Sequence, residues 1–275
     1  MSPNFHLAKV DFESYLEQYA TYKVFRNNNR FNYGEKSIKL SIIDDKEFCN
    51  LIYMGQVQIG GVILRNQSIK HPFLQPGYLH MTEEVISFLH SQITVNKQPD
   101  KGISCLPSDS RQAEVFEKLG YSTVRKLRCM IGPVRKLGWS VPKGYDFKNP
   151  DIADSTAIAK LFYDANIDDP WHQPVTLDHF KWGTELYFDK SKTSQILEAS
   201  SICFEGLTGN PVGACLVSHE EGFPFIYDIH VLKEHRRRGI AYAMMCKAMN
   251  NLAGEHRYIR LFVIDGNPAK ELYSK

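Results

Sequence analysis

The sequence predicts a mixed α/β (α+β) protein of two domains, each with a sheet flanked by helices. The chain has 275 residues, which suits two average domains better than one. The same order of elements (helix, hairpin, strand, helix, strand, helix) occurs twice, with a period of about 140 residues. Between the copies, residues 132–150 hold three prolines and three glycines, as a linker does.

These observations predict a first domain at 1–133, a linker at 134–145 and a second domain at 146–275. The chain is 43% hydrophobic and 23% charged, which is an ordinary globular composition. Each half is therefore long enough and apolar enough to bury a core of its own.

The elements of the first half follow from hydrophobic periodicity and from turn residues. A helix at 82–93 is predicted because Val85, Phe88 and Leu89 recur at helical spacing. Ser110 and Gly120 are typical of the start and the end of a further helix. The other predicted elements are a helix at 11–27, a hairpin of strands 48–56 and 57–65 turning at Gly55, a strand at 102–106 and a closing strand at 122–131.

The second half repeats this plan. Helices are predicted at 151–166 and 176–190, then a hairpin of strands 200–206 and 211–218 around the turn 207–210, and a strand at 224–231. An apolar stripe predicts a helix at 238–255; its members are Ala241, Met244, Met245, Ala248, Met249 and Leu252. Gly254 ends this helix, and a strand at 258–265 and a helix starting near Pro268 follow.

Composition also bounds the function. The six cysteines are scattered without a C-x-x-C pair, which favours a reducing compartment over a disulfide framework. The N-terminus has no apolar leader, and no apolar run reaches the length of a membrane span, so a cytoplasmic protein without a membrane partner is predicted. A net charge of +2 argues against a nucleic-acid partner.

One motif indicates anion binding. The strand 224–231 runs into three arginines, a glycine and a small-residue helix, with the spacing R-x-x-G-x-A from Arg236 through Gly239 to Ala241. The first N–H groups of a helix lack partners, and the helix dipole makes this end positive. Glycine permits close backbone approach, and the arginines add donors. The alternative is a solvated basic cluster.

This motif resembles the acyl-CoA pyrophosphate loop of the GCN5-related N-acetyltransferase (GNAT) family, whose pattern is Q/R-x-x-G-x-G/A. Residues 266–275 resemble the second family motif, an asparagine followed by A-x-x-L-Y. The resemblance covers the second half well and the first half loosely. It implies two GNAT-like domains, each a mostly antiparallel twisted sheet flanked by helices, with acetyl-CoA as co-substrate. The residues implied in cofactor binding are Ile229, His230, Val231, Arg236, Arg237, Arg238, Gly239, Ile240, Ala241, Tyr242 and Asn267.

The resemblance further implies that Tyr273 protonates the departing thiolate as a general acid, the alternative being an aromatic side chain of the core. The base is Asp228 or His230, which lie two apart on one strand face; otherwise Asp228 accepts backbone hydrogen bonds and His230 is a core histidine. Trp182 or Tyr187 is expected to line the acceptor site. No metal is predicted, because His172 has no second ligand at metal-binding spacing.

The first half departs from the family pattern. Gln75 and Gly77 are too close together for the loop motif, Pro76 lacks a backbone donor, and Phe116 stands where the second half has Tyr273. We expect this degenerate domain to bind no CoA and to act as a scaffold, a substrate wall or a dimer surface.

The second half departs from the pattern at its end, where the family continues through a Leu-Gly-aromatic turn and two more strands. The strand at 258–265 is therefore expected to have an open edge, unless the chain is cut short or another segment or subunit covers it.

The predicted function is direct transfer of an acetyl group from acetyl-CoA to an amine on a small molecule or peptide, by a monomer or a homodimer. The alternatives are a non-catalytic acyl-CoA sensor, favoured by the missing strands, and a nucleic-acid binder that uses the arginines. Binding to nucleic acid would weaken steeply with salt. Polyamines, amino acids, aminoglycoside-like compounds and protein termini stay open as acceptors.

Overall fold

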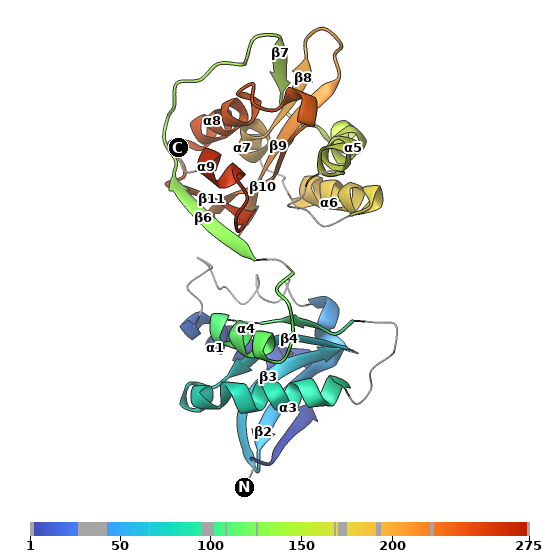
Figure 1. Ribbon diagram of the computed structural model, residues 1–275. Helices are drawn as coiled ribbons and strands as arrows, with labels where there is room; N and C mark the ends of the chain where they lie inside the picture. The colour runs from blue at the N-terminus through green and yellow to red at the C-terminus, as the bar shows by residue number, and fades with distance from the viewer. Residues whose placement is uncertain are drawn as a thin grey trace. The chain divides into compact units, whose positions relative to one another are not determined.

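The computed structural model describes residues 3–26, 43–65, 67–94, 102–107, 109–124, 126–167, 169, 175–190, 194–220 and 223–273 (Figure 1). The chain divides into two compact units, Met1–Val124 and Arg125–Lys275. Each unit has its own sheet and its own buried apolar clusters.

The first unit contains a five-stranded sheet in which the strands lie in chain order. Neighbours are antiparallel except β4 and β5, which are parallel. The strands are β1 (Phe5–Lys9), β2 (Cys49–Met54), β3 (Val57–Arg65), β4 (Ser68–Leu74) and β5 (Ser104–Leu106). The helices are α1 (Phe12–Arg26), α3 (Thr82–Thr94) and α4 (Ser110–Lys118), with 3₁₀ turns η1 (Ile43–Phe48) and η2 (Pro76–Met81).

The second unit contains a six-stranded sheet of order β6-β11-β10-β9-β8-β7, in which only β10 and β11 are parallel neighbours. The strands are β6 (Leu127–Pro133), β7 (Tyr145–Lys148), β8 (Ser201–Glu205), β9 (Pro211–Glu220), β10 (Phe223–Val231) and β11 (Tyr258–Ile264). The helices are α5 (Ser155–Asn166), α6 (Leu177–Lys190), α7 (Ser194–Ala199), α8 (Ile240–Leu252) and α9 (Ala269–Tyr273), with 3₁₀ turns η3 (Ile152–Asp154) and η4 (Lys233–His235).

The two sheets share one topology, which confirms the predicted mixed α/β fold and internal repeat. Strands β7 to β11 follow one another as β1 to β5 do, and the last pair is the parallel one in both units. A helix connects the parallel strands in each case, α3 in the first unit and α8 in the second. Strand β6 is an addition to the second sheet that has no counterpart among the described residues of the first unit.

The prediction that the strand at 122–131 closes the first half is wrong. Strand β6 pairs antiparallel with β11 along its whole length, from Leu127 opposite Ile264 to Pro133 opposite Tyr258. The edge of β11 would otherwise expose unpaired backbone groups, and β6 satisfies them. Another segment of the same chain therefore covers the edge that was expected to be open. The sequence analysis also did not predict β1, β4, β7 and α7.

The segment between β6 and β7 lies along the second unit, although residues 134–145 were predicted to be a linker. The N–H of Val134 donates to the carbonyl of Arg257 at 2.9 Å. The Asn250 side chain accepts from the N–H of Leu137 at 2.6 Å and donates to its carbonyl at 2.8 Å. Val134 and Val141 pack against the core. The boundary between the compact units instead falls between residues 124 and 125.

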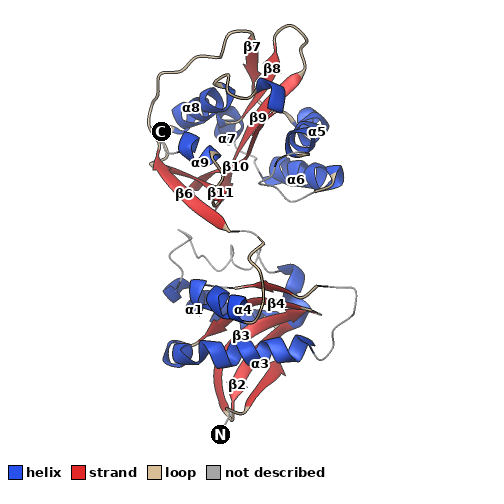
Figure 2. Cartoon of the chain, viewed as in Figure 1, coloured by secondary structure: helices blue, strands red, loops and turns tan. Residues whose placement is uncertain are grey.

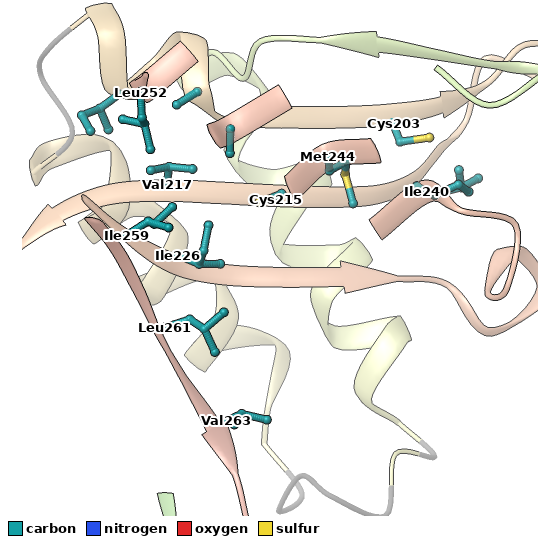
Figure 3. Packing of buried hydrophobic residues seen from close by; sticks show 14 of the residues in the cluster. Cys203, Cys215, Val217, Ile226, Ile240, Met244, Leu252, Ile259, Leu261 and Val263 are labelled. Carbon is teal, nitrogen blue, oxygen red and sulfur yellow. The ribbon is translucent and has the colours of Figure 1, made fainter. Parts of the chain in front are cut away.

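The second sheet is covered on both faces (Figure 2). Helices α7 and α8 cover one face, where Met244 and Leu252 meet Val217, Ile226 and other strand residues (Figure 3). Helices α5 and α6 cover the β8–β10 part of the opposite face. The strands that carry the candidate site are therefore held rigidly between helices.

All six cysteines are free thiols, four of them buried. Among the described residues, no helix combines the length and the apolar character needed to cross a membrane.

Candidate functional site

The loop between β10 and α8 presents a series of backbone N–H groups. Arg237 and Gly239 have φ angles of 64° and 80°, so the backbone alternates into the left-handed region before α8 begins. Within the described part of the chain, the N–H groups of residues 237–242 donate to no backbone acceptor, and Ala243 is the first to do so, to Gly239 at 2.9 Å. No side chain caps this helix start. Such a run of N–H groups at a helix N-terminus is suited to bind an anion.

The three arginines serve different purposes. Arg236 anchors the loop: its Nε donates to the carbonyl of Val231 at 3.0 Å, and its guanidinium donates to the carbonyl of Ala165 at 2.9 Å. The Arg238 guanidinium donates to the hydroxyl of Tyr145 at 2.9 Å. Arg237 is exposed and lies beside the N–H series. The sequence analysis treated all three as donors to a ligand, and it missed Tyr145, which no motif marks.

The parallel strands β10 and β11 diverge beside this loop. Their register holds one aligned pair, Phe225 with Arg260. Residues Ile229, His230 and Val231 pair with β9 on their other side, opposite Cys215, Ala214 and Gly213. Their backbone is thus held in extended form by β9, on the stretch of β10 that has no aligned partner in β11, and this is where the sequence analysis expected pantetheine.

A β-bulge in β10 sets the direction of the titratable side chains. The register with β9 shifts between Ile226 and Asp228. Ile226 and Ile229 belong to the cluster under α8, whereas Tyr227 belongs to the cluster under α5 and α6. Asp228 shares the face of His230, since its Oδ1 lies 2.6 Å from Nε2 of that residue. The predicted common face of Asp228 and His230 is confirmed.

Burial distinguishes these two residues. The side chain of Asp228 is 33% exposed and that of His230 is 8% exposed. The His230 ring packs against Phe162 with ring centroids 4.9 Å apart, and Nδ2 of buried Asn166 lies 3.3 Å from its Nδ1. Asp228 is therefore the more accessible of the two to a ligand. The buried ring of His230 contacts its carboxylate from the interior of the protein. The sequence analysis did not identify Asn166 as a site residue, because an asparagine at the end of a predicted helix carries no local signal that it contacts His230.

Tyr273, at the end of α9, packs against the cluster under α8. Burial raises the pKa of its hydroxyl well above the ordinary value, and the neighbouring Cys215 and Asp228 act in the same direction. The phenol therefore stays protonated at neutral pH, as a proton donor must. The ring of Tyr273 thus belongs to the core, and its role as a general acid stays a prediction.

The turn before α9 is fixed by strand β6. The N–H of Asp265 donates to the carbonyl of Lys126 at 2.8 Å, and the Arg128 guanidinium donates to the Asp265 carboxylate at 2.7 Å. This pair holds the pKa of Asp265 below its ordinary value. Asn267 then caps α9 by accepting from the N–H of Ala269 at 2.9 Å. A segment from the junction of the two units thus orients the helix that carries Tyr273.

In the first unit, side chains of α4 lie beside the end of the corresponding parallel strand pair. Strands β4 and β5 pair only from Ser68 to Lys70. Beyond this point, the buried side chain of Gln112 donates to the carbonyl of Pro72 at 2.9 Å. Phe116 is only 2% exposed. Side chains of α4 are therefore buried beyond the end of the β4–β5 pairing.

The remaining candidates are structural or lie elsewhere. Tyr187 is fully buried, and its hydroxyl bonds to Oγ of Ser200 at 2.8 Å, so it belongs to the core, whereas Trp182 is 61% exposed. His172 lies outside the described residues. Across the described ranges, no cluster of three or more metal-binding side chains occurs.

The fold and the loop have relatives among known proteins. Residues 162–275 match the model of the acetyltransferase (GNAT) family. A search of curated proteins found no match.

Solved structures resemble the whole chain. A GCN5-related N-acetyltransferase from Sphaerobacter thermophilus has a TM-score of 0.68 and 18% identity, over 98% of this chain and 90% of that one. A tandem GNAT protein from the clavulanic acid biosynthesis pathway has a TM-score of 0.58 and 11% identity, over 98% and 93%. A GNAT-family acetyltransferase from Colwellia psychrerythraea has a TM-score of 0.59 and 15% identity, over 98% and 94%. The likeness is one of fold, and the predicted arrangement of two GNAT-like domains is confirmed.

Proposed function

Because residues 162–275 match the model of the acetyltransferase (GNAT) family, we propose that this protein transfers an acetyl group from acetyl-CoA to an amine. A GNAT domain supports acyl transfer from acyl-CoA in general. The single observation that carries the proposal is the run of unpaired N–H groups at 237–242, which begins α8 beside the divergence of β10 and β11. We place the protein in the cytoplasm.

The N–H groups of residues 237–242 bind the diphosphate, and the exposed guanidinium of Arg237 adds positive charge. The guanidiniums of Arg236 and Arg238 instead hold the loop in place, by donating to the carbonyl of Ala165 and to the hydroxyl of Tyr145. The pantetheine then lies along Ile229, His230 and Val231, between the diverging strands. Asn267 contributes by holding the start of α9.

In the reaction, the amine nitrogen attacks the thioester carbon and the carbon–sulfur bond breaks. Asp228 takes the proton of the amine, directly or through water, and Tyr273 gives its proton to the departing thiolate. Burial raises the pKa of the nearby Cys215 thiol to about 12, so this cysteine is not a nucleophilic thiolate at neutral pH. We propose that transfer is direct, without an acyl-enzyme.

Tyr273→Phe tests the proposal. We expect kcat for thiol release from acetyl-CoA, measured with a panel of amines, to fall about 100-fold, because a general acid contributes at least about that factor. The affinity for CoA by calorimetry is expected to stay within about twofold, since the ring remains in place. Tyr121→Phe, which removes a hydroxyl in the first unit, is the matched control. Tight CoA binding without thiol release on any amine would instead support the acyl-CoA sensor.

Asp228→Asn tests the assignment of the base. We expect kcat/KM to fall about tenfold or more at neutral pH and to recover partly as pH rises, because the amine then loses its proton without help. His230→Gln places a polar amide beside Asp228 and is expected to cost less. A larger loss for His230→Gln than for Asp228→Asn would reverse the two roles.

The sensor was favoured by the absence of strands beyond β11, and β6 now occupies that edge. We propose that the first unit is a degenerate GNAT-like domain that binds no CoA, because Gln112 and Phe116 are buried beyond the end of its parallel strand pair and Gln112 bonds there to the carbonyl of Pro72. We propose that its role is structural, as a scaffold.

A further inference from the structure

Exposed apolar side chains form a strip on the second sheet. They lie on the face of β6 and β11 opposite α8, because the alternate residues Met130, Ile259, Leu261 and Val263 pack under α8. The exposed fractions are 50% for Leu127, 41% for Ile131, 46% for Tyr258 and 37% for Phe262. Together with Phe225, whose ring lies 5.6 Å from that of Phe262, these residues define the apolar strip.

The apolar strip and Asp228 occupy the same face of the sheet. Phe225 contacts Phe262 and the Arg260 guanidinium, and the bulge turns Tyr227 and Asp228 to this face as well. From the aligned pair of Phe225 and Arg260, Phe262 is two residues further along β11 and Asp228 three residues along β10. Because of the bulge, the three steps from Phe225 to Asp228 span only two residues of β9, from Ser218 to Leu216, so at about 3.3 Å per residue both positions lie about 7 Å beyond the pair. The strip therefore leads toward the carboxylate.

Charge along this face is asymmetric. The partly exposed carboxylate of Asp228 stands at one end. Arg260 lies within the strip, 2% exposed, with its guanidinium carbon 5.7 Å from the Phe225 ring centroid and 6.0 Å from that of Phe223. A cation close to Asp228 is attracted, whereas a second ammonium group placed over the apolar strip would lose its hydration against side chains that offer it no hydrogen bond.

We propose that the acceptor is a monoamine whose aliphatic or aromatic body lies on the apolar strip while its amino group reaches Asp228. This inference rests on the proposed acetyl transfer. It separates the acceptors that the sequence left open, since polyamines and aminoglycosides carry several positive charges and little apolar surface. Burying an aromatic group against exposed apolar side chains favours the monoamine.

The test compares three amines with the same four-carbon spacing: 4-phenylbutylamine, 1,4-diaminobutane and 4-amino-1-butanol. Their binding to the full chain is measured by calorimetry with and without saturating CoA, and kcat/KM is measured with acetyl-CoA. We expect 4-phenylbutylamine to exceed both others at least about tenfold in affinity and in kcat/KM, in line with the selectivity of apolar pockets. Phe262→Ser is expected to reduce this preference at least about fivefold, with the CoA affinity unchanged.

Leu207→Ser is the matched control, because Leu207 is 96% exposed in the turn between β8 and β9 and is expected to leave the preference unchanged. If Phe262→Ser does not fold, Tyr258→Ser probes the same strip. Equal or tighter binding of 1,4-diaminobutane or 4-amino-1-butanol, no binding of 4-phenylbutylamine, or an unchanged preference in the strip variants overturns the inference. Failure to bind CoA instead removes the proposed function, and the amine titrations without CoA still test the strip.

Discussion

Gly239→Glu is expected to lower the affinity for CoA about 1,000-fold, which corresponds to about 4 kcal/mol. Gly239 has a φ of 80°, and a side chain in this left-handed region costs about 1–2 kcal/mol. The added carboxylate also stands beside the N–H groups of residues 237–242, and two like charges about 4 Å apart repel by about 4 kcal/mol at an intermediate dielectric. Calorimetric titration with CoA measures the loss, and Gly239→Ala isolates the backbone contribution.

Gly209→Glu is the matched control for this variant. Gly209 has a φ of 69° in the turn between β8 and β9, and at both glycines nothing lies within 4 Å of an added Cβ. The two variants are thus expected to lose similar stability, and only Gly239→Glu loses CoA. An unchanged CoA affinity in Gly239→Glu, in a folded protein, would contradict the placement of the diphosphate on this loop.

A fragment of residues 146–275 is expected to show no cooperative thermal unfolding, whereas 125–275 unfolds cooperatively. The shorter fragment lacks β6, which pairs with all of β11, and lacks Met130, Val134 and Val141, which pack against the core. Each apolar side chain contributes about 1 kcal/mol or more, and the lost strand pairing adds to this. Their sum is a large part of the about 5–15 kcal/mol that stabilises a typical domain. Circular dichroism on heating measures the difference.

The fragment that keeps residues 125–145 is the control for expression and for the loss of the first unit. In the intact chain, Met130→Asp places a charge against the same core and is expected to destabilise the second unit in the same direction. Cooperative unfolding of 146–275 at the temperature of 125–275 would show that β6 is dispensable for the fold.

The sequence alone determined the local features of the candidate site. The spacing from Arg236 to Ala241 predicted a strand, a tight loop and a helix start, and Gly239 has the positive φ that such a loop needs. The two-residue spacing of Asp228 and His230 predicted their common face, and they are in contact. These features depend on neighbours along the chain, since φ preferences, helix starts and strand alternation are local properties of a few residues.

Only the tertiary structure decided which segments meet. Strand β6 reads as an ordinary strand, and its partner β11 lies more than a hundred residues away, beyond what any local pattern specifies. The carbonyls that bind Arg236, the hydroxyl of Tyr145 beneath Arg238 and the bulge that exposes Asp228 likewise arise from long-range packing. The edge of a sheet accepts whichever strand satisfies its backbone groups, so the pairing is set by the free energy of the whole fold and not by the strand's own residues.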